Sequence, residues 1–489
     1  MTLTALRDDA LAATADGFAL RLGLPWIRSL PIASLAGLHV EIDGDTVTPL
    51  QVDVNGRQVE ASALADEAAW WFLQDRLIVR GDRGVGAGAH RVIVSFDLVI
   101  PYLQIRPDGP LTLPFRIERT LVTDAAPAAP LSPVIDPHTG APVLAPRGSA
   151  RDDTTPPDLP AAWSLTASAF NWTPEVILAE RAATDIAAGI IADGIAEAIE
   201  VEPGQLWRSF PEPDAAEVEA LRETLEALGG RVSIVGASLD DWLPGSRRRD
   251  EEERLAFLVP QLKDARRMGA LGVRLPIGQA GEPLLRKVRP LLHDLDLVLF
   301  EEIQGQQTPG SASAGVAIDT IGLIDDPHIR LLVDVSMLMP SVPESYLEQL
   351  QRGGVALELI TRLRNEWRDP ATVEAIVDLL RSGGVPPQIH TLYMDMLVRF
   401  GRSDATVLRS ILPLVGAFHL KFWDLDDADG RVSEPIRDLG ALLAPTAFAG
   451  TLTSEWGGHE WLDADPSEMT RAHLALARGA LAAGSRPLA

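Results

Sequence analysis

The sequence DLVLFEEIQGQQ at residues 296–307 decides the fold class, because it reads as the end of a buried parallel strand. A largely apolar run leads directly into two adjacent carboxylates, Glu301 and Glu302, and then into amides and a glycine. An apolar run that ends in acidic and turn-forming residues is typical of a parallel strand whose C-terminal end opens into a site. We therefore expect an α/β fold with its chemistry at the carboxyl ends of the strands.

Strands of this kind alternate with amphipathic helices over the C-terminal two thirds of the chain. Eight strand–helix units in about 325 residues match a (β/α)8 TIM barrel in number and length. The connection between the sixth and seventh strands is long and contains additional helical patterns. The strands are expected at residues 164–170, 197–202, 231–237, 271–277, 296–303, 329–337, 417–423 and 450–456.

The N-terminal part of the chain has a different pattern. Short alternating runs, separated by turn sequences rich in Gly, Asp and Asn, extend to residue 122 and predict an all-β sandwich domain at residues 1–122. Residues 123–160 are rich in Pro, Ala, Asp, Ser and Thr and predict an extended linker. The barrel is then expected at residues 161–489.

The composition of the chain indicates a globular protein and excludes several kinds of site and partner. The chain has 489 residues, 46% of them hydrophobic, so a large core can form. Its net charge of −26 argues against nucleic acid or an anionic membrane as a partner, because both are negatively charged. It has no cysteine, which excludes disulfides and thiolate metal sites. Since neither a signal peptide nor a long apolar span is evident, we expect a cytoplasmic protein.

Four neighbouring strand ends carry residues that could bind a metal ion together. Glu301 or Glu302 ends the fifth expected strand, and Asp334, His419 and Glu455 end the sixth, seventh and eighth. Strand alternation lets only one of the two adjacent glutamates face the barrel interior, and we favour Glu302. Three oxygens and one imidazole nitrogen suit Mn²⁺, with Mg²⁺, Co²⁺ and Zn²⁺ as alternatives. A single acid at a strand end often caps the next helix, but four in register favour a metal site.

Further polar residues are expected near the same end of the barrel. Lys421 follows His419 by two residues, so it shares the inward direction and could place a positive charge near a carbonyl or an enolate. His459 lies on a Gly-Gly turn beyond the eighth strand and could reach the site. Arg274 and Glu202 could bind substrate hydroxyls, although cap or surface ion-pair roles are equally compatible with their positions.

The barrel resembles the sugar phosphate isomerase/epimerase family of xylose-isomerase-like TIM barrels. Within that family, HLKFWD at residues 419–424 and SEWGGH at residues 454–459 are most similar to the large subunit of bacterial C-glycoside deglycosidases. Residues 24–44, 71–79 and 113–121 resemble the small β-sandwich subunit of the same enzymes. The chain therefore resembles a fusion of the two subunits.

The resemblance implies an elimination and not a hydrolysis, because a carbon–carbon glycosidic bond has no leaving oxygen to protonate. A separate oxidoreductase would first make the 3-ketone of the sugar. Removal of the C2 proton, supported by a divalent metal, would then expel the aglycone from C1. The expected substrate is thus a small glycoside or keto-sugar, and we expect a homo-oligomer. The alternatives are a keto-sugar epimerase or isomerase with the same metal site, and a sugar-binding protein without activity.

One residue departs from the family pattern. The deglycosidases have a histidine two residues beyond the glutamate of the fifth strand, and it resembles the catalytic base. This chain has Gln304 there, which could contact substrate but cannot accept a proton. The resemblance leaves two options open: Glu302, Glu455 or His459 acts as the base, or the reaction differs.

Overall fold

The computed structural model describes residues 5–106, 109–126 and 158–486, which form two compact units. The N-terminal unit comprises Leu3–Pro156 and Asp240–Arg249. The barrel unit comprises Met1–Thr2, Pro157–Leu239 and Asp250–Ala489. Most of the predicted linker at residues 123–160 lies outside the described residues.

The N-terminal unit consists of antiparallel sheets, as its alternating sequence predicts. Every second residue of β10 (Ala89–Arg106) from Val92 to Ile100 is buried, because successive side chains of a strand point to opposite faces. Phe18, Leu20 and Leu22 of β2 are buried in the same alternating way. One sheet has the order β1 (Leu11–Thr14), β2 (Gly17–Gly23), β9 (Arg76–Gly81), β6 (Gln51–Val54), β7 (Arg57–Glu60). The other has the order β11 (Gly109–Val122), β10 (Ala89–Arg106), β4 (Leu35–Ile42), β5 (Asp45–Val47).

The segment Asp240–Arg249 belongs to the N-terminal unit although it follows a barrel strand in the chain. It forms a small antiparallel pair of β15 (Trp242–Leu243) and β16 (Arg247–Arg248). The buried Arg28 guanidinium donates a hydrogen bond to Asp240 Oδ1 at 2.6 Å and lies 4.0 Å from the Tyr102 ring centre. The sequence pattern contains no sign of this exchange between the two units.

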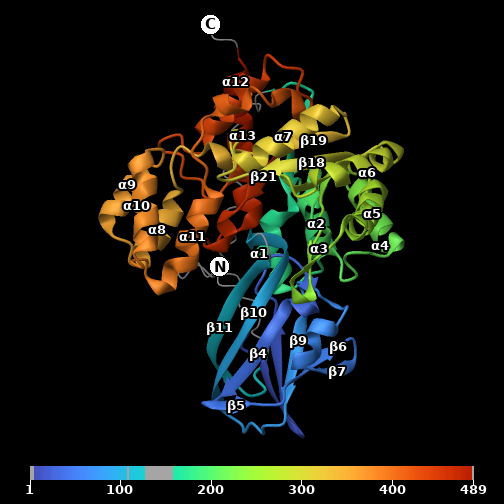
Figure 1. Cartoon of the computed structure of the whole chain (residues 1–489), viewed down its shortest axis with the longest axis vertical. Helices are drawn as coiled ribbons and strands as arrows, with labels where there is room; N and C mark the ends of the chain where they lie inside the picture. Colours follow the sequence, from blue (N-terminus) through green and yellow to red (C-terminus); the bar gives the residue numbers. More distant parts are fainter. Residues whose placement is uncertain (1–4, 107–108, 127–157, 487–489) are drawn as a thin grey trace, which may run out of the picture. The chain divides into compact units, whose positions relative to one another are not determined.

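The barrel unit is a closed barrel of parallel strands surrounded by helices, which confirms the predicted fold (Figure 1). The last strand pairs with the first, and this pairing closes the sheet. The strands, in barrel order, are β12 (Trp163–Ser168), β13 (Ala198–Val201), β14 (Arg231–Gly236), β17 (Gly272–Pro276), β18 (Val298–Ile303), β19 (Ile329–Asp334), β20 (Val415–Phe422) and β21 (Gly450–Trp456).

Some of the surrounding helices begin with an aspartate whose side chain caps the first turn, namely Asp214, Asp250 and Asp465. Asp250 and Glu253 form a capping box at the start of α5, which satisfies backbone N–H groups of the first turn. The main helices of the layer are α2 (Ala183–Ala192), α4 (Ala215–Ala227), α5 (Glu251–Arg267), α6 (Gly281–Leu295), α7 (Ala312–Ile324), α12 (Ser433–Leu443) and α13 (Pro466–Ser485). None of the described helices has the length and hydrophobicity that a membrane span requires.

The long connection between β19 and β20 forms a helical insertion, as predicted. Its helices are α8 (Glu344–Arg352), α9 (Leu357–Asn365), α10 (Pro370–Arg381) and α11 (His390–Arg399), and they gather as one group in Figure 1. They share a hydrophobic core that includes Tyr346, Trp367 and Phe400. Trp423, just beyond β20, packs into this core, so the insertion is fixed to the end of a strand that carries candidate site residues.

Candidate metal centre

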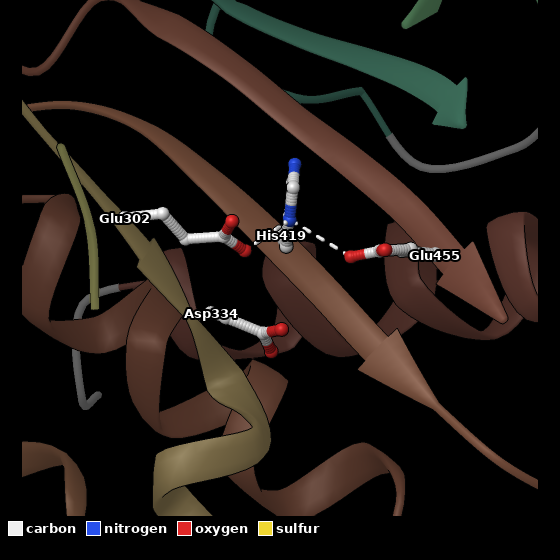
Figure 2. A group of neighbouring side chains, drawn as sticks. All are labelled: Glu302, Asp334, His419 and Glu455. Carbon is white, nitrogen blue, oxygen red and sulfur yellow. Dashed lines mark hydrogen bonds and ion pairs between the residues drawn. The ribbon is translucent and has the colours of Figure 1, made fainter. Parts of the chain in front are cut away.

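Four buried side chains from four consecutive strands meet at the carboxyl end of the barrel. Glu302 lies near the end of β18, Asp334 ends β19, and His419 and Glu455 lie on β20 and β21. One potential ligand atom from each lies within 4.8 Å of those of the other three. Figure 2 shows the side chains pointing toward one another from their separate strands. The strand-end pattern predicted this meeting because parallel strands end at the same edge of a sheet.

The His419 ring is oriented by carboxylates on both of its nitrogens. Its Nδ1 lies 2.9 Å from Glu302 Oε1 and 2.8 Å from Glu455 Oε2, and Figure 2 shows both interactions. Its Nε2 lies 2.9 Å from Glu200 Oε2, on the opposite side of the ring. The Nδ1 atom therefore faces the carboxylates of the cluster, and Nε2 faces away from them.

The electrostatics of the cluster favour a cation at its centre. Burial would lower the pKa of His419, but Glu200, Glu455 and Glu302 outweigh this effect and hold its pKa well above the usual range. Burial raises the pKa of Asp334 to about 7, although the Lys421 ammonium opposes that shift. Acids crowded into a low-dielectric site resist losing their protons unless positive charge is supplied.

The residues present fit a divalent ion. Asp334 Oδ2 is buried and has no hydrogen-bond partner among the described residues. A buried oxygen without a donor is costly, and a bound cation would satisfy it. Three carboxylates and one imidazole form a ligand set that suits Mn²⁺ and related metals.

The two adjacent glutamates of β18 have different surroundings. Glu302 faces the cluster, and Glu301 faces the other side of the strand, as alternation requires. Glu301 accepts backbone hydrogen bonds from Gly278 at 3.0 Å and Ala280 at 3.3 Å, in the loop that follows β17. Burial raises the pKa of Glu301 to about 7, although the two backbone hydrogen bonds and the charge of Arg254 oppose this shift.

Lys421, Phe170 and His459 form a continuous set of contacts that starts at Glu455. Lys421 Nζ lies 3.0 Å from Glu455 Oε1 and 5.4 Å from the centre of the Phe170 ring. The Phe170 and His459 ring centres are 4.9 Å apart. His459 is 3% exposed, and its Nε2 has no hydrogen-bond partner among the described residues. Burial lowers the pKa of His459 to about 4, so its imidazole is neutral near pH 7.

The remaining predicted site residues have unequal positions. The Gln304 side chain is exposed. Arg274 Nη1 lies 3.1 Å from Glu302 Oε2 and its Nη2 lies 2.5 Å from Glu202 Oε1, so both predicted substrate-binding residues are engaged in ion pairs beside the cluster. Sequence reasoning missed Glu200 and Phe170. The signal for Glu200 was its spacing of two residues from Glu202, which lies in extended conformation just beyond β13, so both side chains point to the same side.

No protein-family model matches the chain. The alpha subunit of a C-glycoside deglycosidase from Arthrobacter globiformis is 25% identical over 329 residues, which are 65% of this chain and 90% of that subunit. The beta subunit of a 3'-dehydrocarminate deglycosidase from Microbacterium sp. is 34% identical over 103 residues, 20% of this chain and 77% of that subunit. A C-glycoside deglycosidase beta subunit from Microbacterium trichothecenolyticum is 33% identical over 112 residues, 22% of this chain and 86% of that subunit.

Among solved structures, a D-psicose 3-epimerase crystallised in the presence of D-fructose aligns with 65% of this chain and 99% of its own length. The sequence identity is 12% and the TM-score is 0.40.

Proposed function

Because this chain belongs to the C-glycoside deglycosidase family and is similar to both of its subunits, we propose that it cleaves 3-oxo-glycosides by metal-dependent elimination. The observation that carries the proposal is the buried convergence of Glu302, Asp334, His419 and Glu455. These residues would hold the divalent ion, with Mn²⁺ as the favoured metal. When bound, the ion would supply positive charge beside the ketone oxygen of the sugar and thereby acidify the neighbouring C–H.

In this proposal His459 removes the proton from C2 of the sugar. The alternatives are less suitable, because Lys421 engages one oxygen of Glu455 and Arg274 engages one oxygen of Glu302. The imidazole of His459 is neutral near pH 7, and its Nε2 atom is unpaired among the described residues. Phe170 and Trp456 pack against the ring edge-to-face and restrict its orientation.

The proposed elimination is balanced in protons and electrons. The C2–H bond breaks, its proton goes to His459, and its electron pair enters the enolate of the 3-ketone. When the ketone re-forms, a C1=C2 double bond forms and the bond from C1 to the aglycone breaks. The aglycone leaves with that electron pair and takes up one proton, so no oxidant or reductant is consumed in this step. Lys421 would hold a sugar oxygen by donating a hydrogen bond.

The substrate must already carry the 3-ketone, since only the ketone makes the C2 proton acidic. We therefore propose that a separate oxidoreductase supplies the oxidised glycoside. The purified full-length protein should release no aglycone from an unoxidised glycoside, and should release it from the matching 3-keto compound.

The test is aglycone release, followed by chromatography, from a 3-keto C-glycoside and from its O-linked counterpart. We expect release with Mn²⁺, loss of release with EDTA, and recovery when Mn²⁺ is added back. His459→Gln should lower the rate by about 10²–10⁴-fold, which is the usual contribution of a general base. His390→Gln removes an exposed histidine of the insertion and serves as the matched control. Release that is insensitive to EDTA, or absent from both substrates, would refute the proposal.

Gln304 favours a second candidate function, a keto-sugar epimerase or isomerase that uses the same residues. Such an enzyme also removes a proton next to a ketone but returns it to the sugar. Incubation in D₂O separates the two functions: deuterium in recovered sugar without aglycone release supports the epimerase or isomerase, and aglycone release supports the lyase.

A further inference from the structure

Glu200 is the buried carboxylate that contacts the outer nitrogen of the His419 ring. It lies on β13, is 0% exposed, and its Oε2 is 2.9 Å from His419 Nε2. Both groups are fully buried and their separation is that of a hydrogen bond, so Glu200 Oε2 is placed to accept a hydrogen bond from His419 Nε2.

The Arg274 guanidinium forms ion pairs with three glutamates. Its Nε donates to Glu200 Oε1, its Nη1 lies 3.1 Å from Glu302 Oε2, and its Nη2 lies 2.5 Å from Glu202 Oε1. The planar, always-charged guanidinium can make these contacts at the same time, which a lysine ammonium cannot do with fixed geometry. The contact with Glu302 Oε2 leaves the other oxygen, Oε1, facing His419 Nδ1 at 2.9 Å.

We propose that Glu200 and Arg274 are positioning residues of the metal centre. Glu200 holds the proton of His419 on Nε2, which makes Nδ1 the metal-binding nitrogen. Arg274 restrains Glu200 and Glu302, so that only Oε1 of Glu302 is presented to the ion. This inference rests on the metal centre of the proposed function, and it adds the atoms that bind the ion and the residues that orient them.

The arrangement follows the general behaviour of metal-binding histidines. A ligating imidazole commonly donates its other N–H to a carboxylate, and this contact sets the tautomer and the ring orientation. Losing such an outer partner typically lowers metal affinity by about 10–100-fold. A purely structural ion pair between Glu200 and Arg274 would stabilise the fold without changing the affinity for the metal.

The experiment measures Mn²⁺ binding directly, without turnover. Free Mn²⁺ is followed by electron paramagnetic resonance during titration of the metal-free, full-length protein. Glu200→Gln keeps the side-chain shape but removes the charge, and we expect it to weaken Mn²⁺ binding by about 10–100-fold. Arg274→Lys keeps a positive charge but loses the three-way contact, and it should also weaken binding.

Glu301→Gln is the matched control, because Glu301 is an equally buried glutamate that faces away from the cluster. We expect its Mn²⁺ affinity to stay within about threefold of the wild type. Thermal unfolding in EDTA tests whether each variant is folded before metal is added.

A crystal structure of the wild-type protein with Mn²⁺ gives a second readout that needs no variant. Nδ1 of His419 and Oε1 of Glu302 on the ion support the inference, and Nε2 of His419 on the ion overturns it. Folded Glu200→Gln protein that binds Mn²⁺ within about twofold of the wild type also overturns it. Failure of the wild type to bind any divalent metal would instead refute the metal centre of the proposed function.

Discussion

Replacing His473 with glutamine should remove a specific part of the protein's sensitivity to acid. His473 lies on α13, is 0% exposed, and stacks on Phe422 with ring centres 3.9 Å apart. Its Nδ1 lies 2.8 Å from Ser454 Oγ, and its Nε2 has no hydrogen-bond partner among the described residues. Burial lowers the pKa of His473 to about 3, so the folded protein holds this imidazole neutral.

The expected magnitude follows from the difference between the folded and unfolded states. An unfolded histidine titrates near pH 6.5, so below that pH the unfolded chain binds a proton that folded His473 does not accept. The contribution is present above pH 6.5 and declines by about 1.4 kcal/mol for each pH unit below it. Between pH 7 and pH 5 the loss from this residue is about 2 kcal/mol. Any folded pKa below about 4 gives nearly the same value.

The assay is urea unfolding of the wild type and of His473→Gln at pH 7 and pH 5, followed by far-ultraviolet circular dichroism. The substitution should lower the free energy of unfolding at both pH values. Between pH 7 and pH 5, however, that free energy should fall by about 2 kcal/mol less in the variant than in the wild type. His390→Gln, which replaces an exposed histidine, should follow the wild type. Equal pH dependence in wild type and His473→Gln would refute the reasoning.

Three other changes have defined outcomes. Despite burial, contacts with His293, the His328 backbone N–H and Arg289 lower the pKa of Asp326 to about 2. Asp326→Asn should therefore lower the free energy of unfolding in urea by about 2 kcal/mol at pH 7. The difference between variant and wild type should shrink below pH 4, because the wild type then loses this contribution. A Cβ on Gly458 would lie 1.7 Å from the Trp423 carbonyl oxygen. Gly458→Ala should therefore lower the unfolding free energy by about 1–3 kcal/mol, and unchanged stability would contradict this. Burial raises the pKa of Asp334 to about 7, so the metal-free protein loses stability as the pH rises from about 4 to about 7. Asp334→Asn should remove the resulting decline in melting temperature with rising pH. It should also weaken Mn²⁺ binding by more than about 100-fold, because it removes a proposed ligand and not only a residue that orients a ligand.

Much of the barrel and its cluster could be predicted because the signals are local. Each strand is an apolar run of a few residues, and parallel strands bring their carboxyl ends to one edge wherever the intervening helices lie. Strand alternation predicts that only one of Glu301 and Glu302 faces the cluster, but not which one. We favour Glu302 from the sequence, and in the structure Glu302 lies with Asp334, His419 and Glu455. That the four residues bind a metal stays a prediction.

The parts that sequence reasoning missed depend on distant partners. Glu200 is one polar residue in the four-residue strand β13, and its contact with His419 joins positions 219 residues apart. Apart from its spacing of two residues from Glu202, nothing near Glu200 in the sequence distinguishes it from a surface acid. From the sequence alone, Phe170 is indistinguishable from an aromatic residue of the core. Only its packing against His459 and Lys421 in the structure shows that it lies beside the cluster.

The membership of Asp240–Arg249 in the N-terminal unit limits how this polypeptide can be divided. A cut within residues 127–157 would give a smaller fragment that lacks ten residues of its own compact unit, including Asp240, the partner of Arg28. Those residues would remain on the larger fragment, between two barrel segments. We therefore expect the smaller fragment to fold fully only in the presence of the larger fragment, which carries residues Asp240–Arg249 of the N-terminal unit. Co-expression of the two fragments, and not expression of either one alone after a cut within residues 127–157, is thus expected to give each part in its native form.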